Sequence, residues 1–595
     1  MQLYASCVPP ALRIRKDRAS ASDCGFSSVG LLPDDLILRK LSARWQGRLT
    51  VNKHFFPGPM TPLPAADDFL VHARMRVVAL QAMLEAQEGQ PVRLIETHIS
   101  WVLLAGTLAY KFKKPVRLPF LDFTTLAARR RFCDEELRLN RRLAPALYLD
   151  VVDVRDSPQG PGFGGAGRVL DVAVRMRRFP DCALWSEMLA AGILAPPHID
   201  AMAQKLWEFH RDAAVALPGS TFGTSAGHQR VTGQLIDSVE AWLAKAAPLD
   251  IGKSVGWLRL RAWLKSQLQV LAPLWEQRLS TGRVRECHGD LHLANVLQLG
   301  GGPAAFDGIE FDDGLRWIDV LYDIAFLSMD LLANGQRALA FRLINTWLEA
   351  SGDYDGLPAL RFYLVSRALV RAQVTALGER LGKHSAACCG PSDYLALASA
   401  LSGSADPRLA ITHGLPGSGK SFVSQQLIEA AGAIRVRADV ERKRLFGLGA
   451  LQSSRDHVPG GIYGATPTAR SYARLLSVAQ IALGAGWPVI VDAAFLQRSE
   501  RAPFAALAAS LRVPFTLVDC RAALPVLRER VAQRTARGGD PSEADTVVLE
   551  RLIAVAQPLD TQELAMALVV DAAQPVPAAV LAKRWLGAKS ALPQV

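Results

Sequence analysis

Residues 414–421 read GLPGSGKS and match the pattern G-x-x-x-x-G-K-S at every fixed position. The stretch follows an apolar run that favours a β-strand, RLAITHG, and precedes a segment with helical periodicity. In that setting the backbone N–H groups of the loop can surround phosphate groups, because glycine removes the side chains that would block their approach. The sequence therefore predicts a nucleotide-binding loop whose lysine contacts the β- and γ-phosphates and whose last serine holds Mg²⁺, formed by Gly414, Gly417, Ser418, Gly419, Lys420 and Ser421.

The chain around this loop alternates between apolar β-like runs and helices. The runs that follow the loop are residues 433–439, 487–496 and 514–520. Apolar runs separated by helices predict a parallel sheet with crossover connections. We therefore expect residues 401–595 to form an α/β domain of their own.

Charged residues near the ends of these runs are candidates for chemistry. Asp439 ends the run 433–439 and Arg442 follows it; there a carboxylate can accept the proton of an acceptor hydroxyl and an arginine can neutralise phosphate charge. Asp492 ends the strand-like stretch PVIVD within the run 487–496, the usual place for a carboxylate near the metal ion. Arg530 and Arg534 share one face of a later helix and could close over the phosphates. The alternatives are an N-cap role for the first aspartate and a merely solvated role for the arginines.

A second stretch, HGDLHLAN at residues 288–295, points to another site. Asp290 and Asn295 have the D-x-x-x-x-N spacing of a catalytic loop, in which the carboxylate accepts a proton and the amide binds Mg²⁺. Asp307 follows at the place of a second metal-binding aspartate. The two histidines of the stretch also allow a zinc site, but a third ligand nearby is missing from the sequence.

Upstream residues supply the remaining parts of such a site. Lys111 and Lys113 lie on one face of a β-like run, and the next helix carries Glu135 and Glu136. A strand lysine paired with a helix glutamate is a device for holding ATP phosphates, and we assign that pairing to Glu136. The four parts occur along the chain in the order that this chemistry needs.

Residues 401–595 resemble the small P-loop kinases, a group that includes gluconate-kinase-like and polynucleotide-kinase-like enzymes and is often described as AAA-type. The likeness is carried by GLPGSGKS, ADVERKRL, VIVDAAFL and RERVAQRTARGGDPSEAD. Residues 66–400 resemble the aminoglycoside-phosphotransferase and choline-kinase-like branch of the kinase fold, through CHGDLHLANV, YKFKKPV and the segment after Asp307. This second resemblance implies that Asp290 is the catalytic base, that Asn295 and Asp307 bind Mg²⁺, and that Asp323 supports the loop from below.

The expected fold class is therefore a two-domain chain: an α+β, protein-kinase-like domain of the aminoglycoside-phosphotransferase type, followed by an α/β P-loop kinase domain with a parallel sheet. This order resembles bacterial proteins described as bifunctional aminoglycoside phosphotransferase/ATP-binding proteins. The expected activity is Mg·ATP-dependent phosphoryl transfer to a small hydroxylated acceptor. The chain departs from the pattern in one respect, because residues 97–114 offer a single glycine, Gly106, where a glycine-rich loop is usual.

Two other functions therefore stay open. One is a regulatory P-loop ATPase with a degenerate, ligand-sensing kinase-like lobe, and the other is a kinase that acts on nucleic-acid ends. The formal G-x-G-x-x-G at residues 160–165 is not followed by a helical pattern, so we interpret it as a hairpin loop rather than a dinucleotide site.

Composition sets the remaining expectations. The chain has 595 residues and a net charge of +12, part of which lies in residues 1–65. We expect these residues to form a poorly ordered basic extension. A further hypothesis is that translation starts at Met60, so that the preceding residues are not part of the native protein. Nucleic acid is an improbable partner, since a diffuse basic surface also suits an enzyme that handles ATP. We expect a cytoplasmic protein without a membrane segment, and the oligomeric state and the acceptor are left open.

Overall fold

The computed structural model describes residues 66–118, 121–246, 255–380, 389–403, 405–454, 464–571 and 576–587, together with residues 462 and 574. The extension predicted for residues 1–65 lies outside the described residues. Among the described helices, none combines the length and the hydropathy that crossing a membrane requires.

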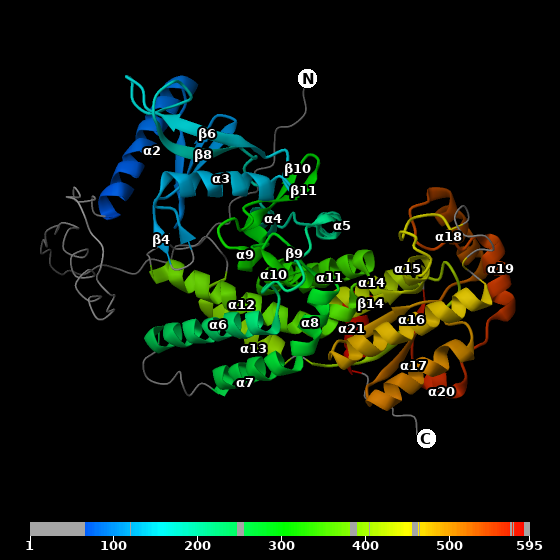
Figure 1. Cartoon of the computed structure of the whole chain (residues 1–595). Coiled ribbons are helices and arrows are strands. Elements are labelled where there is room, and N and C mark those ends of the chain that lie inside the picture. The colour runs from blue at the N-terminus through cyan, green and yellow to red at the C-terminus, as the bar shows by residue number, and fades with distance from the viewer. Residues whose placement is uncertain are drawn as a thin grey trace, which may run out of the picture. The chain divides into compact units, whose positions relative to one another are not determined.

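The first part of the described chain is a six-stranded antiparallel sheet with two long helices (Figure 1). Its strand order is β1-β2-β3-β8-β6-β7, with bounds β1 Arg93–Glu96, β2 Ser100–Ala105, β3 Leu108–Lys113, β6 Tyr148–Arg155, β7 Gly162–Phe163 and β8 Val169–Arg177. The helices are α2, Ala66–Glu88, and α3, Leu126–Asn140, and a small hairpin joins β4, Arg117–Leu118, to β5, Leu121–Asp122.

Alternation along β3 decides which side chains face which helix. Tyr110 and Phe112 pack in the cluster that contains α2, whereas Ala109 packs in the cluster that contains α3. Because successive strand residues point to opposite faces, Lys111 and Lys113 share the α3 side with Ala109. Strands β2 and β3 pair antiparallel on either side of Gly106 and so form a hairpin.

The glycine-rich segment at residues 160–165 lies between β6 and β8, which pair antiparallel. Its strand β7 pairs with the end of β6, and the Phe163 ring stacks on Tyr110 with a centroid separation of 4.4 Å. The segment is therefore a hairpin connection folded back on the sheet, as the hairpin interpretation predicts.

Helices dominate the next part of the chain. They are α4 Trp185–Ala190, α5 Pro196–Asp212, α6 Ser225–Ala246, α7 Val255–Val270, α8 Ala272–Ser280, α9 Asp313–Arg316, α10 Val320–Ala333, α11 Arg337–Ser351, α12 Leu357–Arg380 and α13 Pro391–Ser402. Two short antiparallel strand pairs flank the HGDLHLAN stretch: β9 Val284–Glu286 with β12 Trp317–Asp319, and β10 Val296–Leu299 with β11 Gly302–Ala305. Two single-turn 3₁₀ helices complete the region, η3 Leu293–Asn295 and η4 Tyr354–Gly356.

The C-terminal part is built on a five-stranded parallel sheet of order β14-β15-β13-β16-β17. The strands are β13 Leu409–His413, β14 Ile434–Arg437, β15 Val489–Asp492, β16 Phe515–Arg521 and β17 Ala567–Asp571. The helices are α14 Lys420–Ala431, α15 Ala438–Arg444, α16 Ala465–Gly484, α17 Arg498–Leu511, α18 Leu524–Arg537, α19 Thr546–Val555, α20 Thr561–Ala565 and α21 Ala578–Gly587.

Both faces of this sheet are covered. Alternate strand residues pack with α14 and α21 in one cluster and with α16 and α17 in another. Burial on both faces explains why the strands are continuous apolar runs rather than alternating ones. The predicted fold class is confirmed: a protein-kinase-like part precedes a P-loop part with a parallel sheet.

The two parts share one hydrophobic core, which runs from the helices around α10 and α12 into the face of the parallel sheet. Residues 65–595 accordingly cluster as a single compact unit. The domain boundary at residues 400 and 401 falls inside this unit and stays a prediction.

Candidate active sites

The GLPGSGKS loop joins the end of β13 to the start of α14, at the carboxyl edge of the parallel sheet. Gly414 has a φ of +140°, and a Cβ there would overlap the Cys520 carbonyl oxygen and lie 2.7 Å from Ser418 Oγ. Gly417 has a φ of +84°, and its Cβ would lie 2.9 Å from the Leu527 carbonyl oxygen. The backbone therefore requires glycine at both positions.

A cavity of about 760 Å³ opens at this edge of the sheet. This volume is in the range of small-ligand sites, which span ~300–1,000 Å³. Most of the residues predicted for the P-loop site line it: Gly417, Ser418, Gly419, Lys420, Ser421, Asp439, Arg442, Asp492, Arg530 and Arg534. Gly414 shapes the loop from behind. The sequence analysis missed other polar lining residues, among them Arg437, Tyr472, Asp540 and Arg551.

Lys420 and Asp492, the predicted metal ligand, lie near each other, but the described residues show no ion pair between them. Lys420 Nζ donates to the Leu415 carbonyl oxygen at 2.9 Å, and burial lowers the pKa of the lysine despite the nearby Asp492 carboxylate. Asp492 accepts a hydrogen bond from Ser424 Oγ at 3.2 Å and lies 3.7 Å from Arg437 Nε. Hydroxyl and carboxylate oxygens such as those of Ser421 and Asp492 are ligands that Mg²⁺ prefers.

Asp439 and Arg442, the residues predicted to act on the acceptor, lie on α15, the helix that follows β14. Arg442 donates to Asp439 at 3.0 Å, one turn apart on α15. The N-cap of α15 is Arg437, so Asp439 lies inside the first turn and the N-cap alternative is wrong. The carboxylate is thus held by an arginine at the wall of the cavity, where it can face an acceptor hydroxyl.

The two candidate lid arginines lie on α18 and contact backbone oxygens. Arg530 Nη1 donates to the Gly417 carbonyl at 3.3 Å, and Arg534 Nη2 donates to the Ala544 carbonyl at 2.7 Å. Among the described residues, neither guanidinium forms an ion pair with a carboxylate. Their charges therefore face the cavity without a permanent counter-ion.

The kinase-like part brings its predicted lysines and glutamate together. Lys111 Nζ lies 2.8 Å from Glu136 Oε1 and also contacts the Asp307 carboxylate. Lys113 Nζ lies 2.7 Å from Glu136 Oε2 and also contacts Glu310, which the sequence analysis missed. Glu136 is fully buried, yet the two lysines outweigh burial and lower its pKa to about 2.

Asp307 holds an unusual backbone conformation beside these lysines. Its φ is +61°, in the left-handed region that residues with a Cβ seldom adopt. Its N–H donates to the Tyr148 hydroxyl at 3.1 Å. Backbone strain of this kind is found at binding sites, where neighbouring residues hold the strained residue in place. In this conformation the Asp307 carboxylate contacts Lys111.

The third and the last residue of HGDLHLAN, Asp290 and Asn295, form the predicted acid–amide pair. Asn295 Nδ2 donates to Asp290 Oδ2 at 3.0 Å and to the Asp290 carbonyl at 2.9 Å. His292 Nε2 lies 3.4 Å from the same carboxylate. Burial alone would raise the pKa of Asp290, but the His292 imidazole reverses this effect and lowers it. The carboxylate therefore stays ionised and able to accept a proton.

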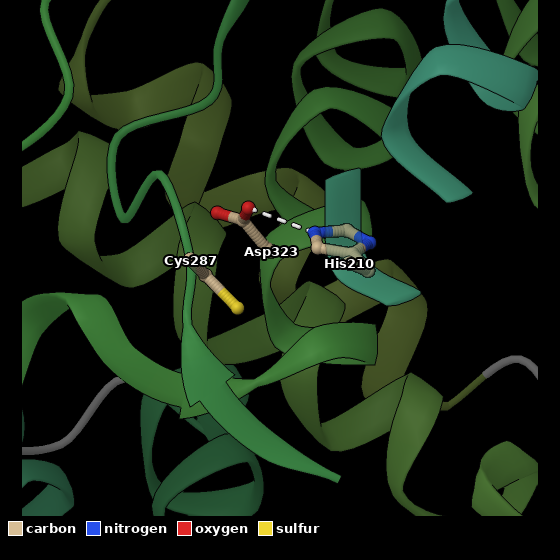
Figure 2. A group of neighbouring side chains, drawn as sticks. All are labelled: His210, Cys287 and Asp323. Atoms are coloured by element: carbon tan, nitrogen blue, oxygen red, sulfur yellow. Dashed lines mark hydrogen bonds and ion pairs between the residues drawn. The ribbon is translucent and has the colours of Figure 1, made fainter. Parts of the chain in front are cut away.

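Hydrogen bonds place Asp323 under this loop. Its carboxylate accepts from the N–H of His288 at 3.1 Å and of Gly289 at 3.0 Å. His210, which the sequence analysis missed, lies 3.1 Å away on the same carboxylate (Figure 2). Trp347 Nε1 donates to His210 Nδ1 at 3.2 Å, so the proton of the imidazole is on Nε2 and points at Asp323.

His210, Cys287 and Asp323 form a compact buried group (Figure 2). Both ring nitrogens of His210 have hydrogen-bond partners, and Cys287 Sγ donates to the Ile318 carbonyl at 3.5 Å. This group is a support for the loop rather than a metal centre. The zinc alternative at His288 is disfavoured as well, because its Nε2 lies 2.9 Å from the Phe306 carbonyl and its Nδ1 accepts from the Asp290 N–H.

Fold and sites define a kinase-like domain joined to a P-loop domain, and comparison with known proteins supports this class. Residues 409–559 match the model of a family described as "AAA domain". The "Uncharacterized protein Rv2004c" of Mycobacterium tuberculosis and the "Uncharacterized protein Mb2027c" of Mycobacterium bovis are each 31% identical over 466 residues, which are 78% of this chain and 90% of the relative. The chain belongs to the same family as these mycobacterial proteins.

Solved structures give more distant similarities. A choline/ethanolamine kinase family protein from Mesorhizobium loti is 13% identical and covers 57% of this chain and 93% of its own, with a TM-score of 0.32. A gluconokinase from Sinorhizobium meliloti 1021 is 22% identical and covers 30% of this chain and 90% of its own, with a TM-score of 0.21. Both scores are low, so the fold assignment rests on the strand orders described above.

Proposed function

We propose that this protein is a Mg·ATP-dependent phosphotransferase that phosphorylates a small hydroxylated acceptor in the P-loop cavity. The observation that carries the proposal is the cavity of about 760 Å³. It is lined by the GLPGSGKS loop, by Asp492, the predicted metal ligand, and by Asp439, the predicted base for the acceptor. That space suits a nucleotide with a small acceptor better than a polymer end. A cytoplasmic location would supply the ATP.

Each residue has a defined task in this reaction. The loop N–H groups and Lys420 bind the phosphates of ATP, while Ser421 and Asp492 offer oxygens to Mg²⁺, which neutralises phosphate charge when bound. Asp439 takes the proton of the acceptor hydroxyl while the hydroxyl oxygen of the acceptor bonds to the γ-phosphorus. The bond from that phosphorus to the β–γ bridging oxygen breaks, which releases ADP. Arg442, Arg530 and Arg534 oppose the charge of the transferring group.

The kinase-like part supports a second phosphotransfer site of the same reaction class. This second site is supported by the Lys111–Glu136 ion pair, the Asp290–Asn295 hydrogen bond and Asp307. Together these residues can position ATP and deprotonate an acceptor. There Asp290 would accept the proton, and Asn295 and Asp307 would hold Mg²⁺. The rival functions are a regulatory ATPase and a nucleic-acid end kinase.

Transfer of labelled γ-phosphate from ATP into a small-molecule extract tests these assignments. We expect Lys420→Ala and Asp290→Asn each to remove a different labelled product. Products that disappear with Lys420→Ala alone would make the kinase-like part a sensor, and hydrolysis without any labelled product would favour the regulatory ATPase. Labelling of added oligonucleotides, with binding that falls steeply as salt rises, would favour the end kinase.

A further inference from the structure

Helix α11, residues 337–351, belongs to the kinase-like part but packs against the P-loop part as well. It contacts α5 and α10 on one side and α14 and β14 on the other (Figure 1). Three of its residues, spaced two apart, reach in these different directions: Asn345, Trp347 and Glu349. The helix is therefore placed to touch the supports of both candidate sites.

Asn345 completes the outer edge of the parallel sheet. Strand β14 is the edge strand, so its outward N–H and C=O groups need partners. Asn345 is 1% exposed, donates to the Ala433 carbonyl at 2.9 Å and accepts from the Arg435 N–H at 2.6 Å. Its amide thus takes the place of a neighbouring strand and fixes α11 to β14.

Glu349 holds two arginines of that strand. One carboxylate oxygen lies 2.7 Å from Arg435 and the other lies 3.5 Å from Arg437. Arg437 lines the cavity and approaches the Asp492 carboxylate at 3.7 Å. Glu349 therefore takes up part of the charge of Arg437, so that less of it acts on Asp492 and on the nearby Asp540 and Asp439.

Trp347 connects the same helix to the other site. Its indole N–H fixes the tautomer of His210, which donates to Asp323, and Asp323 binds the backbone N–H groups of His288 and Gly289. One set of hydrogen bonds thus joins α11 to the loop that carries Asp290, a second set of hydrogen bonds and ion pairs joins it to the residues beside the P-loop cavity, and the helix itself connects the two.

We propose that α11 couples the two sites and that Glu349 is a positioning residue for the P-loop site, acting through Arg437. The inference rests on the proposed function of that cavity as a Mg·nucleotide site. With Glu349 in place, Arg437 is held back from Asp492, which stays available to Mg²⁺. Without it, the Arg437 guanidinium moves onto Asp492 and competes with the metal ion.

Titration of the full chain with Mg·ADP tests the positioning role. We expect Glu349→Gln to weaken binding about tenfold and to raise the Mg²⁺ concentration needed for half-saturation, because a charged partner of Arg437 is lost. The matched control is Glu429→Gln, which removes a 2.7 Å ion pair between α14 and Arg342 of the same helix but touches neither site. Its affinity should stay within about twofold of the parent.

Equal effects of Glu349→Gln and Glu429→Gln, or an unchanged Mg²⁺ requirement, would overturn the positioning role. Should Glu349→Gln fail to fold, Glu349→Asp keeps the charge but shortens the reach to Arg437. We expect that variant to fold and to bind Mg·ADP more weakly than the parent, and parental affinity would overturn the role.

Hydrogen exchange of the His288 and Gly289 amides tests the coupling. At a Mg·ADP concentration that fills only the tighter P-loop site, exchange there should slow in the parent protein, less so in Trp347→Phe, which keeps the ring but lacks the N–H, and not at all in Lys420→Ala. An unchanged rate in the parent, or slowing that persists in Lys420→Ala, would contradict the link. Neither readout needs phosphoryl transfer, so a missing labelled product would count against the proposed function and not against this inference.

Discussion

The lysines of the two candidate sites have opposite surroundings. Lys420 lines an open cavity and donates to a backbone carbonyl, and burial lowers its pKa. Lys111 and Lys113 are both held by Glu136, and each has a second carboxylate besides. Burial would lower the pKa of Lys111 too, but Asp307 and Glu136 raise it well above its usual value.

In the P-loop site the lysine charge has no carboxylate partner among the described residues and can bind phosphate directly. In the kinase-like site the lysine charges are already neutralised by carboxylates of the protein. At the P-loop the protein leaves a positive charge for the ligand to meet. In the kinase-like site Asp307 already contacts Lys111, so a nucleotide has to displace that carboxylate, and Mg²⁺ is the natural agent because it offers Asp307 another partner. We therefore expect tight nucleotide binding at the first site and weaker, more strongly Mg²⁺-dependent binding at the second.

The largest effect should come from closing the P-loop with a methyl group. In Gly414→Ala the new Cβ would meet the Cys520 carbonyl and Ser418 Oγ at a φ of +140°, so the loop has to move. A shift that costs about 3 kcal/mol lowers Mg·ADP affinity about 100-fold. Calorimetric titration measures it, and Gly484→Ala on α16, with open space around its Cβ, is the control.

The same titration also measures the second site. Binding that survives Gly414→Ala with a changed Mg²⁺ dependence would belong to the kinase-like part and would show that its lysine pairs open. Retention of the parental affinity would contradict the requirement for glycine at Gly414.

Glu136→Gln should have the next largest effect, on stability. The substitution leaves two buried lysines with one fewer carboxylate, and breaking such a buried pair costs about 3 kcal/mol in the free energy of unfolding. Glu135→Gln is the matched control, because Glu135 is partly exposed and its arginine partners keep other acceptors; we expect about 1 kcal/mol or less. Chemical unfolding distinguishes the two, and equal losses would contradict the central role of Glu136.

The contrast between Glu135 and Glu136 also shows the limit of local sequence rules: the pairing was assigned to Glu136, and both lysines contact it, but no local rule excludes Glu135. Period-two alternation predicts that Lys111 and Lys113 share a face, and the fixed positions of GLPGSGKS predict the loop, because both are local rules. Which of two adjacent glutamates turns inward depends on the rotation of α3 against the sheet. That rotation is set by packing between residues far apart in the chain.

The residues of α11 were out of reach for the same reason. Asn345, Trp347 and Glu349 lie in an ordinary amphipathic helix, and nothing local distinguishes them from core and surface residues. Their roles arise only when β14 is brought beside the helix. Arg437 was missed although it is two residues from Asp439, since its direction depends on Glu349.

Lysine reactivity sharpens the comparison directly. Amine-reactive reagents attack the neutral amine, and a lowered pKa increases the neutral fraction at a given pH, whereas a raised pKa decreases it. At about pH 8.5 we expect Lys420 to be modified faster than Lys111, because the lowered pKa of Lys420 leaves more of it as the neutral amine. Mass spectrometry of the modified peptides measures the ratio. Mg·ADP should protect Lys420, and equal rates would contradict the assigned surroundings.

The smallest effects should come from the arginines that face the open cavity. Arg530→Ala and Arg534→Ala remove exposed or half-buried charges that contact backbone oxygens in the structure and that we propose to contact phosphate when nucleotide binds. Contacts of exposed charges contribute about 0.5–1 kcal/mol, so each variant should lose about threefold in nucleotide affinity, and both should lose more in transfer rate than in affinity. Arg528→Ala, on the same helix but paired with Glu550 away from the cavity, should change neither. An equal loss in Arg528→Ala would mean that the general positive field of α18 attracts the nucleotide. The lid role would then be wrong, while the contrast between an open and a self-neutralised site would stand.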